Sequence, residues 1–315
     1  MKTLQNRREF LKISTAGTVG VMVFSPFSGK SAVVVDKKSF GMGLQLYTVR
    51  NAMGIETDEP ADKLATLQKI SDLGYKYLEL ADYQNGLFYG YAPQELKKIV
   101  TDLDMEIISS HTQVEAEGIT LENAQKMADD HAVLGVKYCV QPWIEEVDRS
   151  VEKYKKMIAD WNQVGEIMKG KNIQFAYHNH DFEFKPTKDG QIPYYDIFLA
   201  EMDPNMIVME LDLYWATMAG QDPVEMFNRY PGRFQLWHLK DSSSTAVAPI
   251  YDVDEDSKSY IAPVGSGVID FKRIFDARDV AGMKYTFVED DNQGNGDAFG
   301  SIETSINNLT SNILS

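Results

Sequence analysis

Apolar and polar residues follow two different rhythms along this chain. From residue 41 onward, short runs rich in β-branched and aromatic residues alternate with longer segments in which apolar residues recur every three or four positions. The short runs predict eight strands, at 43–47, 77–81, 106–110, 137–141, 173–178, 206–211, 234–239 and 284–289. The clearest helix is predicted over Val151–Lys169, with one apolar stripe. We expect Asp148 to be its N-cap and Gly170 to end it in a left-handed conformation.

A short repeated motif supports this number of strands. Gly74, Gly135 and Gly282 each follow a helical segment and precede a predicted strand, and each is followed two residues later by Lys-Tyr. These glycines are 61 and 147 residues apart, which corresponds to about two and about four to five βα units of roughly 30 residues. The pattern therefore predicts an α/β fold, a (β/α)8 TIM barrel that forms a single domain over residues 39–315.

A doubly wound open sheet is the main alternative to the barrel. Such a sheet usually has a Gly-rich turn after its first strand, but residues 46–50 contain no glycine. The longest irregular stretch, 242–267, follows the seventh predicted strand, and in a barrel it would lie over the active face. Within this stretch, Gly265 and Gly267 resemble a phosphate-binding turn only loosely.

The first 38 residues differ from the rest of the chain. Arg7 and Arg8 precede Phe-Leu-Lys, and a mildly apolar stretch broken by glycines and a proline runs to about residue 27. This stretch is too short and too polar for a stable membrane span of roughly 20 residues. We therefore expect residues 1–38 to be a twin-arginine export signal and leader. The processed protein would be periplasmic and would have no membrane anchor. The alternative is an amphipathic N-terminal helix of the mature protein.

Charge and cysteine content exclude several classes of protein. The net charge of −16 argues against a nucleic-acid partner, because phosphate backbones are bound by clustered Lys and Arg. It also argues against docking on an anionic membrane surface. The single cysteine, Cys139, rules out an internal disulfide, so the fold must be held by its core.

Histidines and carboxylates follow the last four predicted strands, although the chain holds only five histidines. They include His178 and His180 after the fifth strand, Glu210 and Asp212 at the sixth, His238 and Lys240 at the seventh, and Glu289 at the eighth. Any one of them has a structural alternative, as a helix cap or a hydrogen-bonded packing residue. Together, at four adjacent strand ends, they would repel one another unless a cation neutralised them. The sequence thus predicts one divalent metal ion, with Mn2+ favoured and Mg2+, Co2+ or Zn2+ as alternatives.

Four further side chains are candidates for substrate contact. His111 ends the third predicted strand and Glu79 lies near the end of the second, so both are expected at the same face as the metal site. Trp143 and Trp215 follow the fourth and sixth strands and could stack against a sugar ring, although packing of the barrel rim is the alternative role. His131 lies on an apolar helical stripe and is interpreted as structural.

These residues resemble the xylose isomerase-like barrel superfamily, which includes sugar phosphate isomerases and epimerases. The resemblance covers nearly all of the chain from Gly43 onward. It rests on 43–50 (GLQLYTVR), 177–184 (YHNHDFEF), 209–212 (MELD), 237–241 (WHLKD), 264–271 (VGSGVIDF) and 287–289 (FVE). In that family the metal is held by a Glu, Asp, His, Glu set from the fifth to eighth strands.

The resemblance implies specific roles for individual residues. The metal ligands would be Glu183, Asp212, His238 and Glu289, with His180 as the alternative to Glu183. Glu183 and Glu289 would act as acid and base. Lys240 would stabilise an oxyanion or act as a base, and His178 would contact substrate. Where epimerases of the family place a His after the sixth-strand Asp, this chain has Trp215, which weakens the case for ordinary ketose epimerisation.

The resemblance implies a metal-dependent isomerase or epimerase that removes a proton beside a carbonyl through a metal-stabilised enediolate. Because export is expected, the substrate would be a small non-phosphorylated carbohydrate. The alternative is a lyase or hydrolase of keto-glycosides that uses the same enolate chemistry. An abasic-site endonuclease is disfavoured by the acidic charge and the few histidines, and a non-catalytic sugar-binding protein by the intact ligand set. The oligomeric state stays open, a homo-oligomer included.

Overall fold

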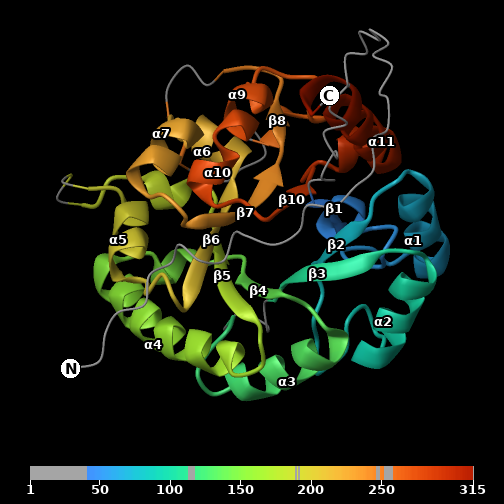
Figure 1. Ribbon diagram of the computed structural model, residues 1–315, viewed down its shortest axis with the longest axis horizontal. Helices are drawn as coiled ribbons and strands as arrows, with labels where there is room; N and C mark the ends of the chain where they lie inside the picture. Colours follow the sequence, from blue (N-terminus) through green and yellow to red (C-terminus); the bar gives the residue numbers. More distant parts are fainter. Residues whose placement is uncertain are drawn as a thin grey trace, which may run out of the picture. The chain divides into compact units, whose positions relative to one another are not determined.

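The computed structural model describes residues 41–112, 118–188, 190, 192–245, 249–251 and 258–314. Eight parallel strands close into a barrel in the order β1-β10-β7-β6-β5-β4-β3-β2, with the helices ringed around them (Figure 1). The strands are β1 (Gly41–Gln45), β2 (Tyr77–Leu80), β3 (Glu106–His111), β4 (Tyr138–Gln141), β5 (Gln174–His178), β6 (Ile207–Asp212), β7 (Phe234–Leu239) and β10 (Tyr285–Val288). The predicted (β/α)8 fold is confirmed.

The outer layer consists of amphipathic helices that bury one face on the strands. They are α1 (Lys63–Asp72), α2 (Pro93–Asp102), α3 (Ala124–Leu134), α4 (Val151–Lys169), α5 (Tyr194–Glu201), α6 (Leu213–Met218), α7 (Pro223–Arg229), α9 (Phe271–Asp276), α10 (Arg278–Ala281) and α11 (Ala298–Asn308). Short 3-10 helices are η1 (Leu46–Val49), η3 (Glu146–Asp148), η4 (Phe182–Phe184) and η5 (Gln293–Gly296), and Leu309–Ile313 is a π-helix. No described helix is long and apolar enough to cross a membrane.

The predicted bounds of α4 are correct, but both predicted caps are wrong. Ser150, not Asp148, accepts the hydrogen bond from the amide of Lys153, because Asp148 still belongs to the preceding 3-10 helix. Gly170 has a right-handed φ of −59°. The left-handed residue that ends this turn is Asn172, with a φ of 61°.

The repeated glycine motif does mark helix ends. Gly74, Gly135 and Gly282 have φ values of 98°, 91° and 78°. Residues that carry a Cβ rarely adopt this backbone conformation. Each therefore reverses the chain from a helix into β2, β4 or β10. The first strand ends two residues earlier than predicted, because the Gln45 side chain accepts the amide of Tyr47 and starts the 3-10 helix η1.

Apolar side chains fill the lower part of the barrel interior, which positions the polar side chains above them. A buried cluster there includes Ile108, Val140, Ala176, Leu236 and Phe287. Gly43 leaves room for Phe287, since a Cβ at Gly43 would lie 2.6 Å from the Phe287 ring. The larger core lies between the strands and the surrounding helices.

The stretch after β7 is anchored by one carboxylate. Asp241 begins the short strand β8 (Asp241–Ser242), which pairs with β9 (Ile261–Ala262). Its carboxylate accepts the amides of Ser242, Gly265, Gly267 and Ile269 at 2.7–3.1 Å. The two glycines that loosely resembled a phosphate turn thus bind a side chain of the protein itself. Residues 246–248 and 252–257 of this stretch lie outside the described residues.

Candidate functional site

The carboxyl ends of the barrel strands carry a group of ionisable side chains around a cavity. The cavity has a volume of about 720 Å³, which is within the range of pockets for small organic ligands. Its lining includes His111, Trp143, His178, His180, Lys240, Glu289 and Asp291. This is the barrel face on which active sites of this fold lie.

Four buried side chains at this face could together hold a cation. They are called the candidate cation set below and are His178, Asp212, His238 and Glu289. One potential ligand atom of each lies within 4.8 Å of the others. His238 Nδ1 is 2.7 Å from Glu289 Oε2 and 3.8 Å from Asp212 Oδ2. Nδ1 of His178 is buried and makes no hydrogen bond to a described residue, although Glu210 Oε2 lies 3.3 Å from it. Two imidazoles and two carboxylates, one with an unused nitrogen, fit a divalent cation.

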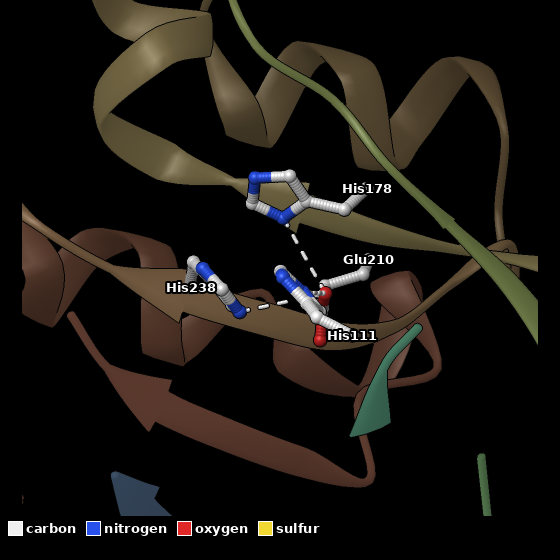
Figure 2. Close-up of side chains that lie close together, drawn as sticks. All are labelled: His111, His178, Glu210 and His238. Atoms are coloured by element: carbon white, nitrogen blue, oxygen red, sulfur yellow. Dashed lines mark hydrogen bonds and ion pairs between the residues drawn. The ribbon is translucent and has the colours of Figure 1, made fainter. Parts of the chain in front are cut away.

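A second polar layer, Glu79, His111 and Glu210, lies against the same histidines. Figure 2 shows the rings of His111, His178 and His238 grouped around the Glu210 carboxylate. Glu210 Oε2 lies 2.6 Å from His111 Nε2, 3.3 Å from His178 Nδ1 and 3.4 Å from His238 Nε2. Both Glu79 and Glu210 are fully buried. Burial raises the pKa of Glu210 to about 7.

Lys240 supplies the positive charge next to the candidate cation set. Its Nζ lies 2.7 Å from Glu289, 3.0 Å from Asp212 and 3.0 Å from Asp291. Burial alone would lower the pKa of Lys240, but these carboxylates raise it well above its ordinary value. Burial likewise would raise the pKa of Glu289, but Lys240 and His238 lower it well below its ordinary value. Lys240 is therefore an ammonium and Glu289 a carboxylate.

The histidines of the site differ in charge. Burial lowers the pKa of His178 and His180 well below the usual value, and that of His111 to about 4. These rings are neutral near pH 7 and can bind a cation or accept a proton. Burial also acts to lower the pKa of His238, but the carboxylates of Glu210, Glu289 and Glu79 raise it well above the usual value.

The structure does not bring Glu183 to the candidate cation set. Tyr177 lies on the opposite face of β5 from His178 and packs among Trp161 and Phe198. The Tyr177 hydroxyl donates to Glu183 Oε1 at 2.5 Å, and the amide of His180 donates to Oε2 at 3.0 Å. Glu183 is fully buried there. His178 stands with Asp212, His238 and Glu289 in its place.

The other predicted site residues divide into two groups. Lys240, Glu289, His111, Trp143 and the catalytic candidate His180 line the cavity, and the buried Nδ1 of His180 has no hydrogen-bond partner among the described residues.

Trp215 and Glu79 are not among the described lining residues. Trp215 is fully buried, with its ring 5.8 Å from that of His180 and 5.4 Å from the Lys240 ammonium. Glu79 contacts His238 instead of the cavity. His131 is structural, as expected, because it binds Thr112 and the carbonyl of Met127.

Sequence reasoning counted Glu210 in the strand-end cluster but gave it no role of its own, and it gave no role to Asp291 or Gln45. Glu210 lies two residues before Asp212 and Asp291 two residues after Glu289, so alternation along a strand was an available signal for both. Gln45 ends β1 and binds Glu79, and its position in the sequence carries no comparable signal.

Comparisons with known proteins agree with this fold. A sugar phosphate isomerase/epimerase from Parabacteroides distasonis ATCC 8503 is 30% identical, with a TM-score of 0.70 over 87% of this chain and 94% of that one. The IOLI protein with a bound zinc atom shares the fold, with a TM-score of 0.64 over 87% of this chain and 98% of that one, at 15% identity.

Curated relatives match over a shorter part of the chain. An inosose dehydratase of Geobacillus thermodenitrificans (strain NG80-2) is 28% identical over 145 residues, which cover 44% of this chain and 46% of that protein. The match thus spans about half of the length of that relative. The relatives of the chain include both isomerase/epimerase and dehydratase proteins, so its fold is that of an enzyme family. Residues 67–294 match the family described as xylose isomerase-like TIM barrel, and the chain belongs to that family.

Proposed function

We propose that this protein is a lyase that eliminates water or an alcohol from a carbohydrate bearing a carbonyl group, such as a keto-cyclitol or a keto-glycoside. The observation that carries the proposal is the arrangement of neutral His180, the Lys240 ammonium and the candidate cation set around one cavity. The similarity to inosose dehydratases supports elimination over isomerisation. This reverses the order in which sequence reasoning ranked the two reactions.

The candidate cation set is placed to assist the removal of a proton beside a carbonyl group. A divalent cation held by His178, Asp212, His238 and Glu289 would supply positive charge for the negative charge that develops on the carbonyl oxygen. Asp212 is held in place for this role, because its Oδ1 accepts the amide of Trp215 at 2.8 Å.

His180 and Lys240 provide a base and an acid for the elimination. A free ring nitrogen of His180 takes the proton from the carbon beside the carbonyl, and the electron pair of that C–H bond forms the new double bond. The C–O bond on the next carbon breaks, and its electrons leave on oxygen. Lys240 protonates that oxygen, so that water or an alcohol departs and an unsaturated ketone remains. Solvent then returns the proton from His180 to Lys240.

The cavity favours a substrate without a phosphate group. Among the described lining residues, the carboxylates are Glu56, Asp82, Glu289 and Asp291, and the ammonium groups are Lys240 and Lys258. Lys240 is already bound to three carboxylates. Neutral hydroxyl groups could therefore donate to these oxygens, whereas the lining offers a phosphate dianion fewer positive than negative side chains. Trp143 offers a ring for stacking on a sugar.

The proposal can be tested with purified protein and Mn2+ in D2O. Inosose and a keto-glucoside are supplied as substrates, and NMR follows both deuterium incorporation beside the carbonyl and formation of the unsaturated ketone. We expect both signals with wild type, and a loss of at least about 100-fold in His180→Gln, the order of a general base. Glu183→Gln is the control and should keep wild-type activity.

The outcomes separate the candidate reactions. Deuterium exchange without elimination would favour an isomerase or epimerase, as the similarity to the Parabacteroides distasonis protein supports. No exchange in either substrate would overturn proton-transfer chemistry on these keto-carbohydrates. Export to the periplasm and assembly into a homo-oligomer are further proposals, and fractionation and light scattering test them.

A further inference from the structure

Beneath the candidate cation set, one buried carboxylate reaches across the barrel to a ligand histidine. Glu79 belongs to β2 and His238 to β7, strands that are not neighbours in the barrel order. Their side chains nevertheless meet in the interior, where His238 Nε2 lies 2.6 Å from Glu79 Oε1. Both residues are fully buried, so water does not compete for this hydrogen bond.

The Gln45 side chain donates one of the hydrogen bonds at the Glu79 carboxylate. Gln45 Oε1 accepts the amide of Tyr47 at 3.0 Å, so its NH2 group must be the end that faces Glu79. That NH2 donates to Glu79 Oε1 at 2.9 Å. A neutral imidazole that binds a cation through Nδ1 carries its proton on Nε2, so in that form Nε2 is the donor and Glu79 Oε1 the acceptor of the 2.6 Å contact. Glu79 Oε1 would then accept two hydrogen bonds, one from Gln45 and one from His238.

The other nitrogen of His238 faces the candidate cation set. Nδ1 lies 2.7 Å from Glu289 Oε2 and 3.8 Å from Asp212 Oδ2. An imidazole whose Nε2 carries the proton presents the lone pair of Nδ1 to a cation. A hydrogen bond that the distal N–H of a ligand histidine donates to a carboxylate fixes the tautomer and the ring orientation of the histidine, and strengthens it as a ligand.

We propose that Glu79 is a positioning residue that holds His238, through its Nε2 proton, in the form that binds a divalent cation at Nδ1. The role rests on the proposed function, since it requires the candidate cation set to bind a metal. Glu210 is the competing acceptor, but its Oε2 is 3.4 Å from His238 Nε2 and its shortest contact is with His111. Glu79 itself is held by Gln45, which forms a chain from β1 through β2 to β7.

The test measures metal binding rather than turnover. Titration calorimetry with Mn2+ gives the Kd of wild type, Glu79→Gln and Gln45→Met. We expect the Kd to rise by 10- to 100-fold in Glu79→Gln, the usual effect of losing such a partner, and by less in Gln45→Met. The matched control is Glu183→Gln, which also replaces a fully buried carboxylate by an amide and should leave the Kd within about twofold of wild type.

Histidine NMR of 15N-labelled protein with Zn2+ provides a second readout that a merely structural role would not change. Wild type should show His238 with a protonated Nε2 in a strong hydrogen bond, and this proton signal should shift upfield in Glu79→Gln. Thermal unfolding checks that each variant is folded. An unchanged Kd together with an unchanged Nε2 signal would overturn the role of Glu79 alone. Failure of wild type to bind either ion, or normal binding by Asp212→Asn, would overturn the candidate cation set and the role with it.

Discussion

The ammonium of Lys240 lies 2.7 Å from Glu289 Oε2, at the point where three buried carboxylates converge. No other described lysine or arginine forms an ion pair with Glu289, Asp212 or Asp291. Lys240 therefore keeps the negative charge of this region compensated when a cation is not bound, and a cation would share that task when present.

Removal of this ammonium should destabilise the metal-free protein. Lys240→Met leaves buried carboxylates without a partner, so we expect the free energy of unfolding to fall by about 3–5 kcal/mol, and Mn2+ to restore part of the loss. Urea unfolding with and without Mn2+ measures this. Lys76→Met, which removes an exposed ion pair with Asp104, should have a much smaller effect, because solvent screens exposed pairs. Equal losses in the two variants would contradict the prediction.

Mn2+ should stabilise wild type but not Asp212→Asn. An ion that binds only the folded state adds about 2.7 kcal/mol at a concentration of 100 times its Kd, and the asparagine lacks the charge that attracts it. Thermal unfolding across a Mn2+ series, together with metal analysis, measures both effects. We expect about one ion per wild-type chain. A variant that gained as much stability as wild type would place the ion elsewhere.

Glu183 should give the protein a distinctive dependence on pH. Burial, opposed by the hydrogen bond from Tyr177, raises the pKa of Glu183 from 4.5 to about 8. Between these values the unfolded chain has released this proton and the folded protein still holds it, so stability falls as pH rises from about 4.5 to about 8. The glutamine side chain in Glu183→Gln cannot titrate, so this variant does not lose stability in this way as the pH rises.

The free energy of unfolding of Glu183→Gln, relative to that of wild type, should therefore rise steadily across that pH range, by more than about 1 kcal/mol in total. Urea unfolding at several pH values gives the comparison. Mn2+ affinity at neutral pH should be unchanged. A parallel pH dependence of the two proteins would show that Glu183 is ionised in the fold, and a loss of Mn2+ binding would restore it as a ligand.

The turn that binds the Asp241 carboxylate should tolerate no side chain at Gly267. A Cβ there would clash with the carbonyl oxygen of Ser242 and with Asp241 itself. We expect Gly267→Ala to lower the free energy of unfolding by about 1–3 kcal/mol, because the hydrogen bonds from the backbone amides to the Asp241 carboxylate are strained or lost. Chemical unfolding measures this, with the neighbouring exposed Ser266→Ala as control, expected within about 0.5 kcal/mol of wild type. A neutral Gly267→Ala would contradict the anchoring role.

The export proposal depends on Arg7 and Arg8, which lie outside the described residues. A twin-arginine signal is read by its receptor through this pair. The double substitution Arg7→Lys and Arg8→Lys should therefore move the protein from the periplasmic to the cytoplasmic fraction of a bacterial host, as followed by immunoblotting. Unchanged fractionation would favour the alternative of an N-terminal helix in the mature protein.

The sequence alone determined the barrel fold and most of the ionisable residues at the carboxyl ends of its strands. Strand and helix periodicities, with the glycines at 74, 135 and 282, specify alternating elements, and parallel strands in a barrel all end at one face. It follows without coordinates that Asp212, His238 and Glu289 converge, since each stands at the end of a strand. The local details of α4 were less secure, because Ser150 and Asp148 are both good N-caps and only the course of the preceding turn selects between them.

Tertiary structure decided which side chains after β5 reach the site and which support them. His180 and Glu183 both lie in the segment that follows β5, but Glu183 turns outward because the Tyr177 hydroxyl binds it on the helical side of β5. The contact between Glu79 and His238 joins residues 159 positions apart, on strands that meet only across the closed barrel. Such a contact depends on the closure and stagger of the whole sheet, which no local pattern in the sequence encodes.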